Sequence, residues 1–391
     1  MQLIGVRRRA LILGCGIAGP VLALFLRRIG VSATVYESTD DVRGVQGNGR
    51  SLLALSASGI DVLRRLGVLK EALAGGFPNL ATVYRNHRGK SLGSTEEARV
   101  LIERGALVRS LRAAARIRGI SIEYGKSLAQ LDVNPTGAIA ATFTDGSALE
   151  GDLLIGADGI RSRVRELAFP EVSPPVFTGH ITSSSVARHP SFASSEAVLS
   201  VTFGREGCFI HRAMPNGEVY WLQSFAEPGA DVRPVASDSD WRERLLALHC
   251  ADPAPIADVI ACSRAPITRQ ALYEPPRLPV WYRGPVCLVG DAAHPVTPPF
   301  GEGPSLALED AMTLARCLRD IQCIDTAFSR FESMRRPRIE RVRRETRRLM
   351  GLGVRVDALG RGVRDLLIPV LLKMGLGSEQ AGASEWTTRA A

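Results

Sequence analysis

Three glycines near the start of the chain have the spacing of a loop that binds a dinucleotide. Gly14, Gly16 and Gly19 form the pattern Gly-x-Gly-x-x-Gly. The first glycine of this pattern permits a tight turn, the second lets the backbone approach a pyrophosphate, and the third allows a helix to pack closely on a strand. Ile17 and Ala18 lie where the unpaired N–H groups of a helix N-terminus would face the phosphates.

A carboxylate follows this loop at the distance that a ribose contact requires. Glu37 lies 23 residues after Gly14, with Ser38 beside it. A carboxylate in this place accepts hydrogen bonds from the 2′-hydroxyl of an adenosine ribose and would repel a 2′-phosphate. We therefore expect the adenosine of FAD or NAD here rather than that of NADP. A glycine-rich turn without a ligand is the alternative interpretation.

The residues around the glycines predict the elements that hold them. Residues 10–13 are a short, continuous apolar run, which is typical of a buried parallel strand. Apolar residues with helical spacing follow, and Gly30 is expected to end that helix. Residues 32–36 then predict a second strand, which Glu37 closes. This strand–turn–helix–strand context is what makes the glycine pattern informative.

Two more motifs follow predicted buried strands. Gly156-Ala157-Asp158-Gly159 comes after the apolar residues 153–155, and Gly290-Asp291-Ala292-Ala293-His294-Pro295 comes after residues 286–289. An aspartate at the carboxyl end of a parallel strand lies in the ligand crevice of an open α/β sheet. Asp291 can accept a hydrogen bond there from a sugar-alcohol hydroxyl.

The chain after Asp291 predicts a loop for a flat ring. Residues 298–303 read Pro-Pro-Phe-Gly-Glu-Gly, a rigid stretch in which small residues let a ring lie against the backbone. Pro304 suits the first turn of the helix that follows. The N-terminus of that helix would stabilise the negative charge of a reduced flavin.

The middle and the end of the chain have a different pattern. Between residues 176 and 280, short alternating runs such as 198–203, 209–212 and 219–225 predict an antiparallel sheet, with Asn216-Gly217 as a hairpin turn. The chain after residue 289 is mostly helical, and residues 354–367 suggest an amphipathic helix that packs across both domains or contacts a membrane or a second subunit.

Composition excludes several classes of protein. Of 391 residues, 45% are hydrophobic and 23% charged, which excludes a disordered, collagen-like or coiled-coil chain. Seven cysteines without a Cys-x-x-Cys pair indicate neither a disulfide framework nor a zinc site, and this fits a cytoplasmic protein. Glycines interrupt the apolar stretch after Arg9, so we expect no signal peptide, and no apolar stretch is long enough for an integral membrane segment.

The net charge of +9 is concentrated in one segment. Eight arginines lie between Arg335 and Arg348, against two glutamates. A patch for nucleic acid or an anionic membrane is one interpretation. We expect the simpler one, a solvated helix face, and no nucleic-acid partner.

The three motifs, in this order, resemble the class A (single-component) FAD-dependent aromatic monooxygenases, the p-hydroxybenzoate hydroxylase-like family, over roughly residues 8–345. Val108-Arg109-Ser110-Leu111 resembles the family's Arg-x-x-Leu helix start, whose arginine contacts the cofactor. Residues 47–52 are similar to the loop beside the ribityl chain, and residues 331–338 resemble the family's closing helix.

The resemblance implies a fold class: α/β, with a Rossmann-like FAD-binding domain, an inserted β-rich, mainly antiparallel substrate domain and a helical C-terminus. Its FAD-binding parts would be residues 1–75, 101–175 and 281–345. Residues 76–100 would be a β-rich insertion, 176–280 the substrate domain and 346–391 a C-terminal helical segment. The cofactor-binding residues would be Gly14, Gly16, Ile17, Ala18, Gly19, Glu37, Ser38, Arg50, Ser51, Arg109, Asp158, Asp291, Gly301, Gly303, Pro304 and Ser305.

The implied activity is that of an NAD(P)H-dependent FAD monooxygenase. The resemblance implies that NAD(P)H reduces the flavin, that O₂ adds to form a C4a-hydroperoxide, and that one oxygen atom passes to an aromatic or polycyclic small molecule. A flavin epoxidase, a Baeyer–Villiger oxygenase and a non-oxygenating flavin reductase or cyclase are the alternatives, and a non-catalytic flavin-binding sensor is a further one. A monomer or a homodimer is expected, with no metal and no assigned catalytic residue.

The sequence departs from the family at two positions. The family usually has Gln and Asn where this chain has Glu302 and Ser305. An ionised Glu302 that points at the flavin would oppose its reduced form, but we expect its side chain to turn to solvent. His294 is expected to pack behind the flavin loop.

Three residues of the predicted antiparallel sheet, His211, Arg212 and Tyr220, are candidates for the substrate pocket. Strand alternation turns only half of such positions inward. Arg50 could pair with a cofactor phosphate or a substrate anion, or be solvated.

Overall fold

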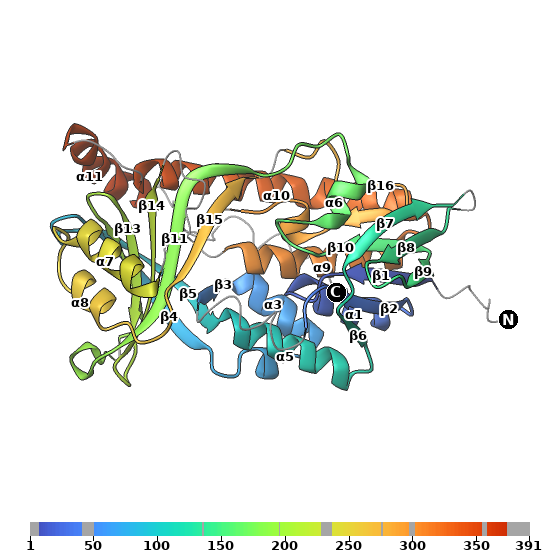
Figure 1. Ribbon diagram of the computed structural model, residues 1–391, viewed down its shortest axis with the longest axis horizontal. Coiled ribbons are helices and arrows are strands. Elements are labelled where there is room, and N and C mark those ends of the chain that lie inside the picture. Colours follow the sequence, from blue (N-terminus) through green and yellow to red (C-terminus); the bar gives the residue numbers. More distant parts are fainter. Residues whose placement is uncertain are drawn as a thin grey trace.

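The computed structural model describes residues 8–40, 51–134, 137–194, 196–227, 237–274, 277–296, 302–353 and 358–373. Figure 1 shows an elongated molecule with a mainly parallel sheet at one end and a larger antiparallel sheet at the other. Long helices run between the two.

The first sheet is six-stranded and has the order β16-β17-β10-β1-β2-β6. Its strands are β1 (Arg9–Leu13), β2 (Ser32–Glu37), β6 (Ser121–Tyr124), β10 (Leu153–Gly156), β16 (Tyr282–Arg283) and β17 (Val286–Leu288). All neighbours are parallel except β16 and β17. Every residue of β10 and β17 is buried, which explains their uninterrupted apolar sequences. The carboxyl ends of β1, β2, β10 and β17 therefore share one edge of the sheet.

Helices enclose this sheet and make the largest core. They are α1 (Ala18–Arg28), α3 (Ala57–Leu66), α4 (Leu69–Ala72), α5 (Arg104–Ile117), α6 (Arg163–Ala168), α9 (Glu302–Asp320) and α10 (Ile324–Gly353). A three-stranded sheet packs alongside, made of β7 (Leu128–Val133), β8 (Ile139–Phe143) and β9 (Ala148–Gly151). Leu22 of α1 and Leu314 of α9 belong to the same buried cluster as Ile12 of β1.

The second sheet is eight-stranded and has the order β15-β11-β14-β13-β12-β4-β5-β3. Its strands are β3 (Leu52–Leu55), β4 (Phe77–Asn86), β5 (Ser91–Glu103), β11 (Val176–Arg188), β12 (Val198–Phe203), β13 (Gly207–Ala213), β14 (Glu218–Ala226) and β15 (Thr268–Glu274). Only β4 and β12 pair in parallel. Gly217, with φ +77°, makes the turn between β13 and β14. Helices α7 (Asp238–His249) and α8 (Ile256–Ala261) cover its outer face (Figure 1).

The predicted fold class is confirmed: an α/β nucleotide-binding unit carries a mainly antiparallel sheet and ends in helices. Some boundaries fall differently. The expected limit at residue 100 lies inside β5, and the limit at 345 lies inside α10. Strand β3, at residues 52–55, pairs with β5 and so belongs to the antiparallel sheet. This pairing joins segments about fifty residues apart, which local sequence patterns do not reveal.

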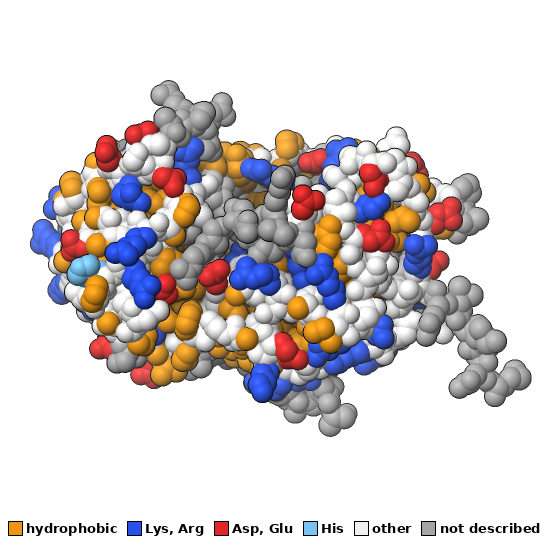
Figure 2. Space-filling model, turned by 60° about the horizontal axis from the view of Figure 1, so that its bottom comes forward, with side chains coloured by type: hydrophobic (Ala, Val, Ile, Leu, Met, Phe, Trp, Pro, Cys, Tyr) orange, Lys and Arg blue, Asp and Glu red, His pale blue; other side chains and the backbone are white. Residues whose placement is uncertain are grey.

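One face of the molecule carries charges of both signs side by side (Figure 2). Figure 2 shows basic and acidic side chains interspersed over the face in view. Helix α11 (Ala358–Lys373) leaves Val363, Leu366 and Val370 exposed and buries Ile368. Within the described part of the chain, every helix is too short or too polar to traverse a lipid bilayer.

Candidate cofactor site

The glycine turn after β1 is shaped by two very close backbone contacts. Gly14 has φ +104°, and a Cβ on it would lie 2.4 Å from the carbonyl oxygen of Ala157. A Cβ on Gly19 would lie 2.0 Å from the carbonyl oxygen of Gly14. A Cβ on Gly16 would have no neighbour within 4 Å. The first and third glycines are thus needed by the fold, whereas the second borders open space.

Two helix N-termini converge on this turn and on the end of β17. Ile17 precedes α1, and its side chain makes no capping hydrogen bond. A Cβ on Gly290 would lie 3.4 Å from the Cβ of Ala307 in α9 and 3.9 Å from that of Ala18 in α1. The first turn of α1 and the second turn of α9 therefore lie against the same strand end. Their N–H groups give this edge a positive potential that suits an anionic ligand.

Glu37 stands at the end of β2 and is tied to the glycine turn. Its Oε2 accepts a hydrogen bond of 2.8 Å from the Cys15 N–H, and its Oε1 accepts one of 3.0 Å from the Thr39 hydroxyl and one of 3.3 Å from the Ser38 hydroxyl. Arg112 of α5 lies 3.6 Å from the same carboxylate and donates to the Cys15 carbonyl at 2.8 Å. Sequence reasoning missed Arg112, because it comes from a helix about seventy residues away.

Asp158 follows β10 and has one oxygen without a partner. Its Oδ2 accepts a hydrogen bond of 3.0 Å from the Val164 N–H. Its Oδ1 is buried and has no hydrogen-bond partner within the described structure. Burial raises the pKa of this carboxyl, against the hydrogen bonds from Ser162 and Val164. An acceptor in this condition fits a ligand that donates a hydrogen bond.

Asp291 follows β17, and its side chain is accessible to solvent. Desolvation by the surrounding protein nevertheless raises the pKa of its carboxyl, and the charge of Arg104 opposes that shift. Arg104 begins α5, and its Nε is buried without a hydrogen-bond partner in the described structure. Asp291 thus offers an acceptor and Arg104 a cationic donor, and the two charges interact.

Two arginines of α5 differ in how they stand toward this edge. Arg109, expected to contact the cofactor, is exposed on α5, more than a turn beyond the start of the helix. Arg104-Gly105-Ala106-Leu107 has the Arg-x-x-Leu spacing and stands at the helix start, so this signal was present in the sequence. The Arg104 N–H also donates to the Ser51 carbonyl at 2.9 Å, which places Ser51 beside it.

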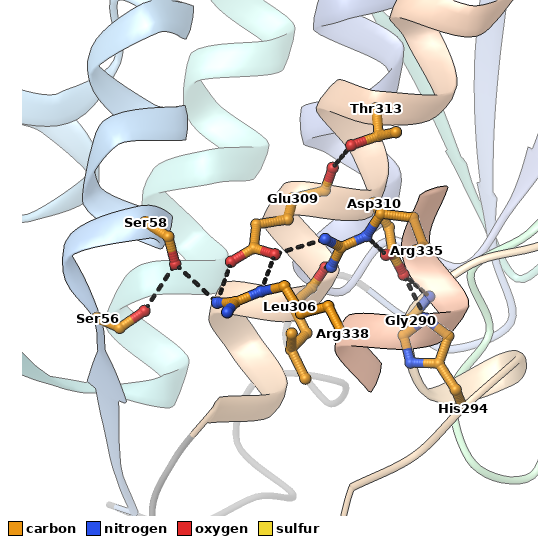
Figure 3. A network of polar contacts seen from close by, with 10 residues as sticks. All are labelled: Ser56, Ser58, Gly290, His294, Leu306, Glu309, Asp310, Thr313, Arg335 and Arg338. Carbon is orange, nitrogen blue, oxygen red and sulfur yellow. Dashed lines mark hydrogen bonds and ion pairs between the residues drawn. The ribbon is translucent and has the colours of Figure 1, made fainter. Parts of the chain in front are cut away.

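A buried ionic network fixes the strand end that carries Asp291 (Figure 3). Asp310 of α9 accepts hydrogen bonds from the Gly290 N–H at 2.9 Å, from His294 Nε2 at 2.6 Å and from Arg335 Nε at 2.7 Å. Burial acts to raise the pKa of Asp310, but the charges of His294 and Arg335 outweigh it and lower that pKa to about 2. His294 is buried and packs on Trp281, with ring centroids 4.7 Å apart.

The arginine-rich segment contributes to this network rather than forming a solvated face. Arg335 is only 1% exposed and also pairs with Glu309 at 2.6 Å. Arg338 pairs with Glu309 at 2.7 Å and donates to the Ser58 hydroxyl (Figure 3). Arg336 pairs with Glu332. The expectation of a solvated helix face is wrong for Arg335 and Arg338, because their partners lie on α9, distant in sequence from the arginines.

The first turn of α9 contains the two residues that depart from the family. Ser305 is buried and accepts a hydrogen bond of 3.0 Å from the Ser56 N–H. A Cβ on Gly59 would lie 2.7 Å from the Ser305 hydroxyl, so the small side chain lets α3 and α9 approach closely. Gly303 and Pro304 lie in the same turn. Ser305 therefore contacts protein on this side.

Glu302 does not turn to solvent, and that expectation is wrong. Its side chain is 14% exposed and pairs with Arg99 of β5, at 2.9 Å between Oε1 and Nη2. Arg99 lies in the antiparallel sheet, about two hundred residues before Glu302 in the chain. Local sequence therefore gave no sign of this pair. Two of the expected cofactor residues, Arg50 and Gly301, lie outside the described residues.

The three pocket candidates of the antiparallel sheet divide between its two faces. Arg212 and Tyr220 are cross-strand neighbours, and Tyr220 packs on Phe77 with centroids 6.1 Å apart. His211 pairs with Trp221, which packs with the residues of α7 and α8. Burial, with the charge of Arg85, lowers the pKa of His211 to about 4. Because α7 and α8 cover the outer face (Figure 1), Arg212 and Tyr220 lie on the inner one, toward the first sheet.

Fold and site together define a dinucleotide-binding α/β protein with one nucleotide unit. An FAD molecule fits the residues present: open space at Gly16, polar atoms on Asp158 and Arg104 that have no partner in the part of the chain the structure describes, and an accessible carboxylate on Asp291. These features line the carboxyl edge of the parallel sheet, where such folds bind nucleotides.

Comparisons with known proteins identify the family. The model of the "FAD binding domain" family matches residues 7–346. The chain is 31% identical to 3-amino-4-hydroxybenzoate 2-monooxygenase of Streptomyces cremeus, covering 87% of this chain and 86% of that one. It is 28% identical to aurachin C monooxygenase/isomerase of Stigmatella aurantiaca, covering 83% and 84%. The crystal structure of Klebsiella pneumoniae HpxO complexed with FAD and uric acid matches with a TM-score of 0.82 at 21% identity, over 95% and 96% of the chains.

The chain therefore belongs to the FAD-binding-domain family of class A flavoprotein monooxygenases. It is an FAD-dependent oxidoreductase of the monooxygenase type, and NAD(P)H is the usual co-substrate of this family.

Proposed function

We propose that this enzyme hydroxylates an aromatic or polycyclic small molecule held between the carboxyl edge of the parallel sheet and the inner face of the antiparallel sheet. The observation that carries the proposal is the position of Gly16, Asp158, Asp291 and Arg104 at one sheet edge, where polar atoms of Asp158 and Arg104 lack partners among the described residues. When bound, FAD supplies the electron transfer from NAD(P)H to O₂.

The proposed tasks of the chain are binding and orientation. The N–H groups at Ile17 and Ala18 bind the pyrophosphate, and Glu37 with Ser38 contacts the adenosine ribose. Asp291 and Arg104 hold the remaining polar part of the cofactor, and Asp158 serves both FAD and the nicotinamide. Gly303 and Pro304, in the first turn of α9, direct its N–H groups toward the ring.

The remaining expected contacts are part of the same proposal. Ser51, next to Arg104, and Arg50 and Gly301, outside the described residues, would complete the cofactor site. Arg212 and Tyr220 would line the substrate side, and Phe77 supports Tyr220 there. The apolar contacts of Tyr220 with Val186 and Met214 help to exclude water, and this exclusion protects reactive intermediates from side reactions.

Hydroxylation is favoured over epoxidation, Baeyer–Villiger oxidation or a reaction without oxygen insertion. The 31% identical relative is named as a monooxygenase of an aminohydroxybenzoate, and a 26% identical one as a 6-hydroxynicotinate 3-monooxygenase, and both names describe aromatic ring substrates. We propose the same substrate class here.

The test is a screen of NAD(P)H oxidation against phenols, quinones and polyketide-like aromatics under ¹⁸O₂. The proposal expects substrate-stimulated NAD(P)H oxidation and a product heavier by one ¹⁸O atom. NAD(P)H consumption that yields only hydrogen peroxide, or a product without ¹⁸O across the screen, contradicts it. A cytoplasmic location and a monomer or homodimer complete the proposal, and light scattering of the purified protein checks the oligomeric state.

A further inference from the structure

An ion pair joins the first turn of α9 to the antiparallel sheet. Glu302 is the first residue of α9, and Arg99 lies in β5 of the antiparallel sheet. Their charged atoms are 2.9 Å apart, and the side chains are 14% and 9% exposed. A pair so well shielded interacts more strongly than a surface pair, because solvent and salt screen it less.

A second contact anchors the same turn from another side. The Ser56 N–H, next to β3, donates to the Ser305 hydroxyl at 3.0 Å, and Gly59 of α3 approaches that hydroxyl closely. The first turn of α9 is therefore held by β5 through Glu302 and by the β3–α3 junction through Ser305. Further along α9, Ala307 lies against Gly290, next to Asp291. The ion pair thus stands close to the proposed cofactor site.

The charge at this place matters for a redox cofactor. A carboxylate near a reduced, anionic flavin opposes reduction, and a guanidinium favours it. At the wild-type position the two charges compensate each other within one ion pair. An uncharged Gln, usual in the family at the position of Glu302, needs no such compensation.

We propose that Arg99 is a positioning residue that neutralises Glu302 at the flavin end of α9 and fastens that helix to the antiparallel sheet. The inference rests on the proposed function, since it concerns the same FAD site. The pair keeps the reduction potential of the flavin independent of the extra carboxylate. It also couples the sheet proposed to hold the substrate to the helix proposed to face the flavin.

The first test measures the flavin midpoint potential of the FAD-loaded enzyme at pH 8, well above ordinary carboxyl pKa values. Glu302→Gln removes the negative member of the pair and should raise the potential. Arg99→Gln removes the positive member and should lower it. In each case we expect at least a tenfold change in the relative affinity for reduced and oxidised flavin, about 30 mV for a two-electron couple. In the double variant, the relative affinity for reduced and oxidised flavin should return to within threefold of the wild-type value.

The second test measures thermal unfolding of the same four proteins. Each single substitution removes a 2.9 Å ion-pair contact from a shielded charge, so each single variant should unfold at least about 4 °C below wild type. The unfolding temperature of the double variant should fall by less than the two single decreases added together, because the pair is lost as a unit. Arg319→Gln, at the far end of α9 in an exposed pair with Asp320, is the control for a loss of one positive charge and should change neither readout.

Several outcomes would overturn the inference. The neutralising role is contradicted if both single variants shift the potential in the same direction. It is also contradicted if they change the relative affinity for reduced and oxidised flavin by less than threefold. Strictly additive unfolding temperatures contradict the fastening role. If a single variant does not bind FAD, the unfolding comparison on flavin-free protein still decides the second part. Failure of the wild-type protein to bind FAD or to insert oxygen would contradict the proposed function instead, so the two failures can be told apart.

Discussion

The replacement of Asp310 by Asn tests whether the buried network holds the strand end that carries Asp291. Asp310 is fully buried and accepts three hydrogen bonds, from Gly290, His294 and Arg335, at 2.9, 2.6 and 2.7 Å. Asn keeps the shape but removes the charge. Loss of one partner from a buried ionic contact costs about 3–5 kcal/mol, a large part of a total stability of about 5–15 kcal/mol.

The pH dependence of the stability difference between wild type and Asp310→Asn gives an independent test. The pKa of Asp310 is lowered from 3.8 to about 2, and one pKa unit corresponds to about 1.4 kcal/mol, so its charged form contributes about 2 kcal/mol. A lowered pKa adds stability that is fully present above the unfolded value and is lost as pH falls through the folded value. The advantage of wild type over Asp310→Asn should therefore be constant from pH 7 to about 5 and shrink between about pH 4 and 2.

Urea unfolding followed by circular dichroism at pH 7, 5, 4 and 3 measures this. Asp320→Asn is the matched control on the same helix, because Asp320 is 55% exposed and its pair with Arg319 is worth at most about 1 kcal/mol. Asp310→Asn should also weaken FAD binding through the Gly290–Asp291 turn, and Asp320→Asn should not. Equal losses for the two variants at pH 7, or a difference that stays the same at low pH, would refute the reasoning.

Two further pairs of variants separate binding from folding. Gly16→Ala should keep the unfolding temperature of the flavin-free protein but weaken FAD binding at least tenfold. Gly19→Ala should lower that temperature, because its Cβ would lie 2.0 Å from a carbonyl oxygen. The reverse pattern in calorimetry and flavin titration would contradict this. Arg104→Gln should weaken FAD binding by about 10- to 150-fold, the equivalent of one charged hydrogen bond, and Arg109→Gln should leave it unchanged, so equal dissociation constants would exclude Arg104.

Local sequence patterns predicted the elements that a single segment determines. The strand at residues 198–203 and the parallel strands before Asp158 and Asp291 lie where the apolar runs placed them. The glycine spacing likewise identified a turn whose close contacts need Gly14 and Gly19.

Three differences from the sequence analysis concern partners that come from distant segments. The pairing of β3 with β5, the burial of Arg335 against α9 and the ion pair of Glu302 with Arg99 depend on which elements the fold brings together. Periodicity within one segment carries no information about these choices. Arg104 is a different case: its spacing was readable, but only the start of α5 showed which arginine stands at the sheet edge.

The most direct measurement of the central claim is a titration of FAD into the flavin-free protein, for wild type and Asp291→Ala. The structure predicts one FAD per chain for wild type and a dissociation constant about 10- to 150-fold higher for Asp291→Ala, since one hydrogen bond to a charged group is lost. A wild-type protein that takes up no flavin, or an Asp291→Ala variant that binds it as tightly as wild type with its fold intact, would contradict the proposed site.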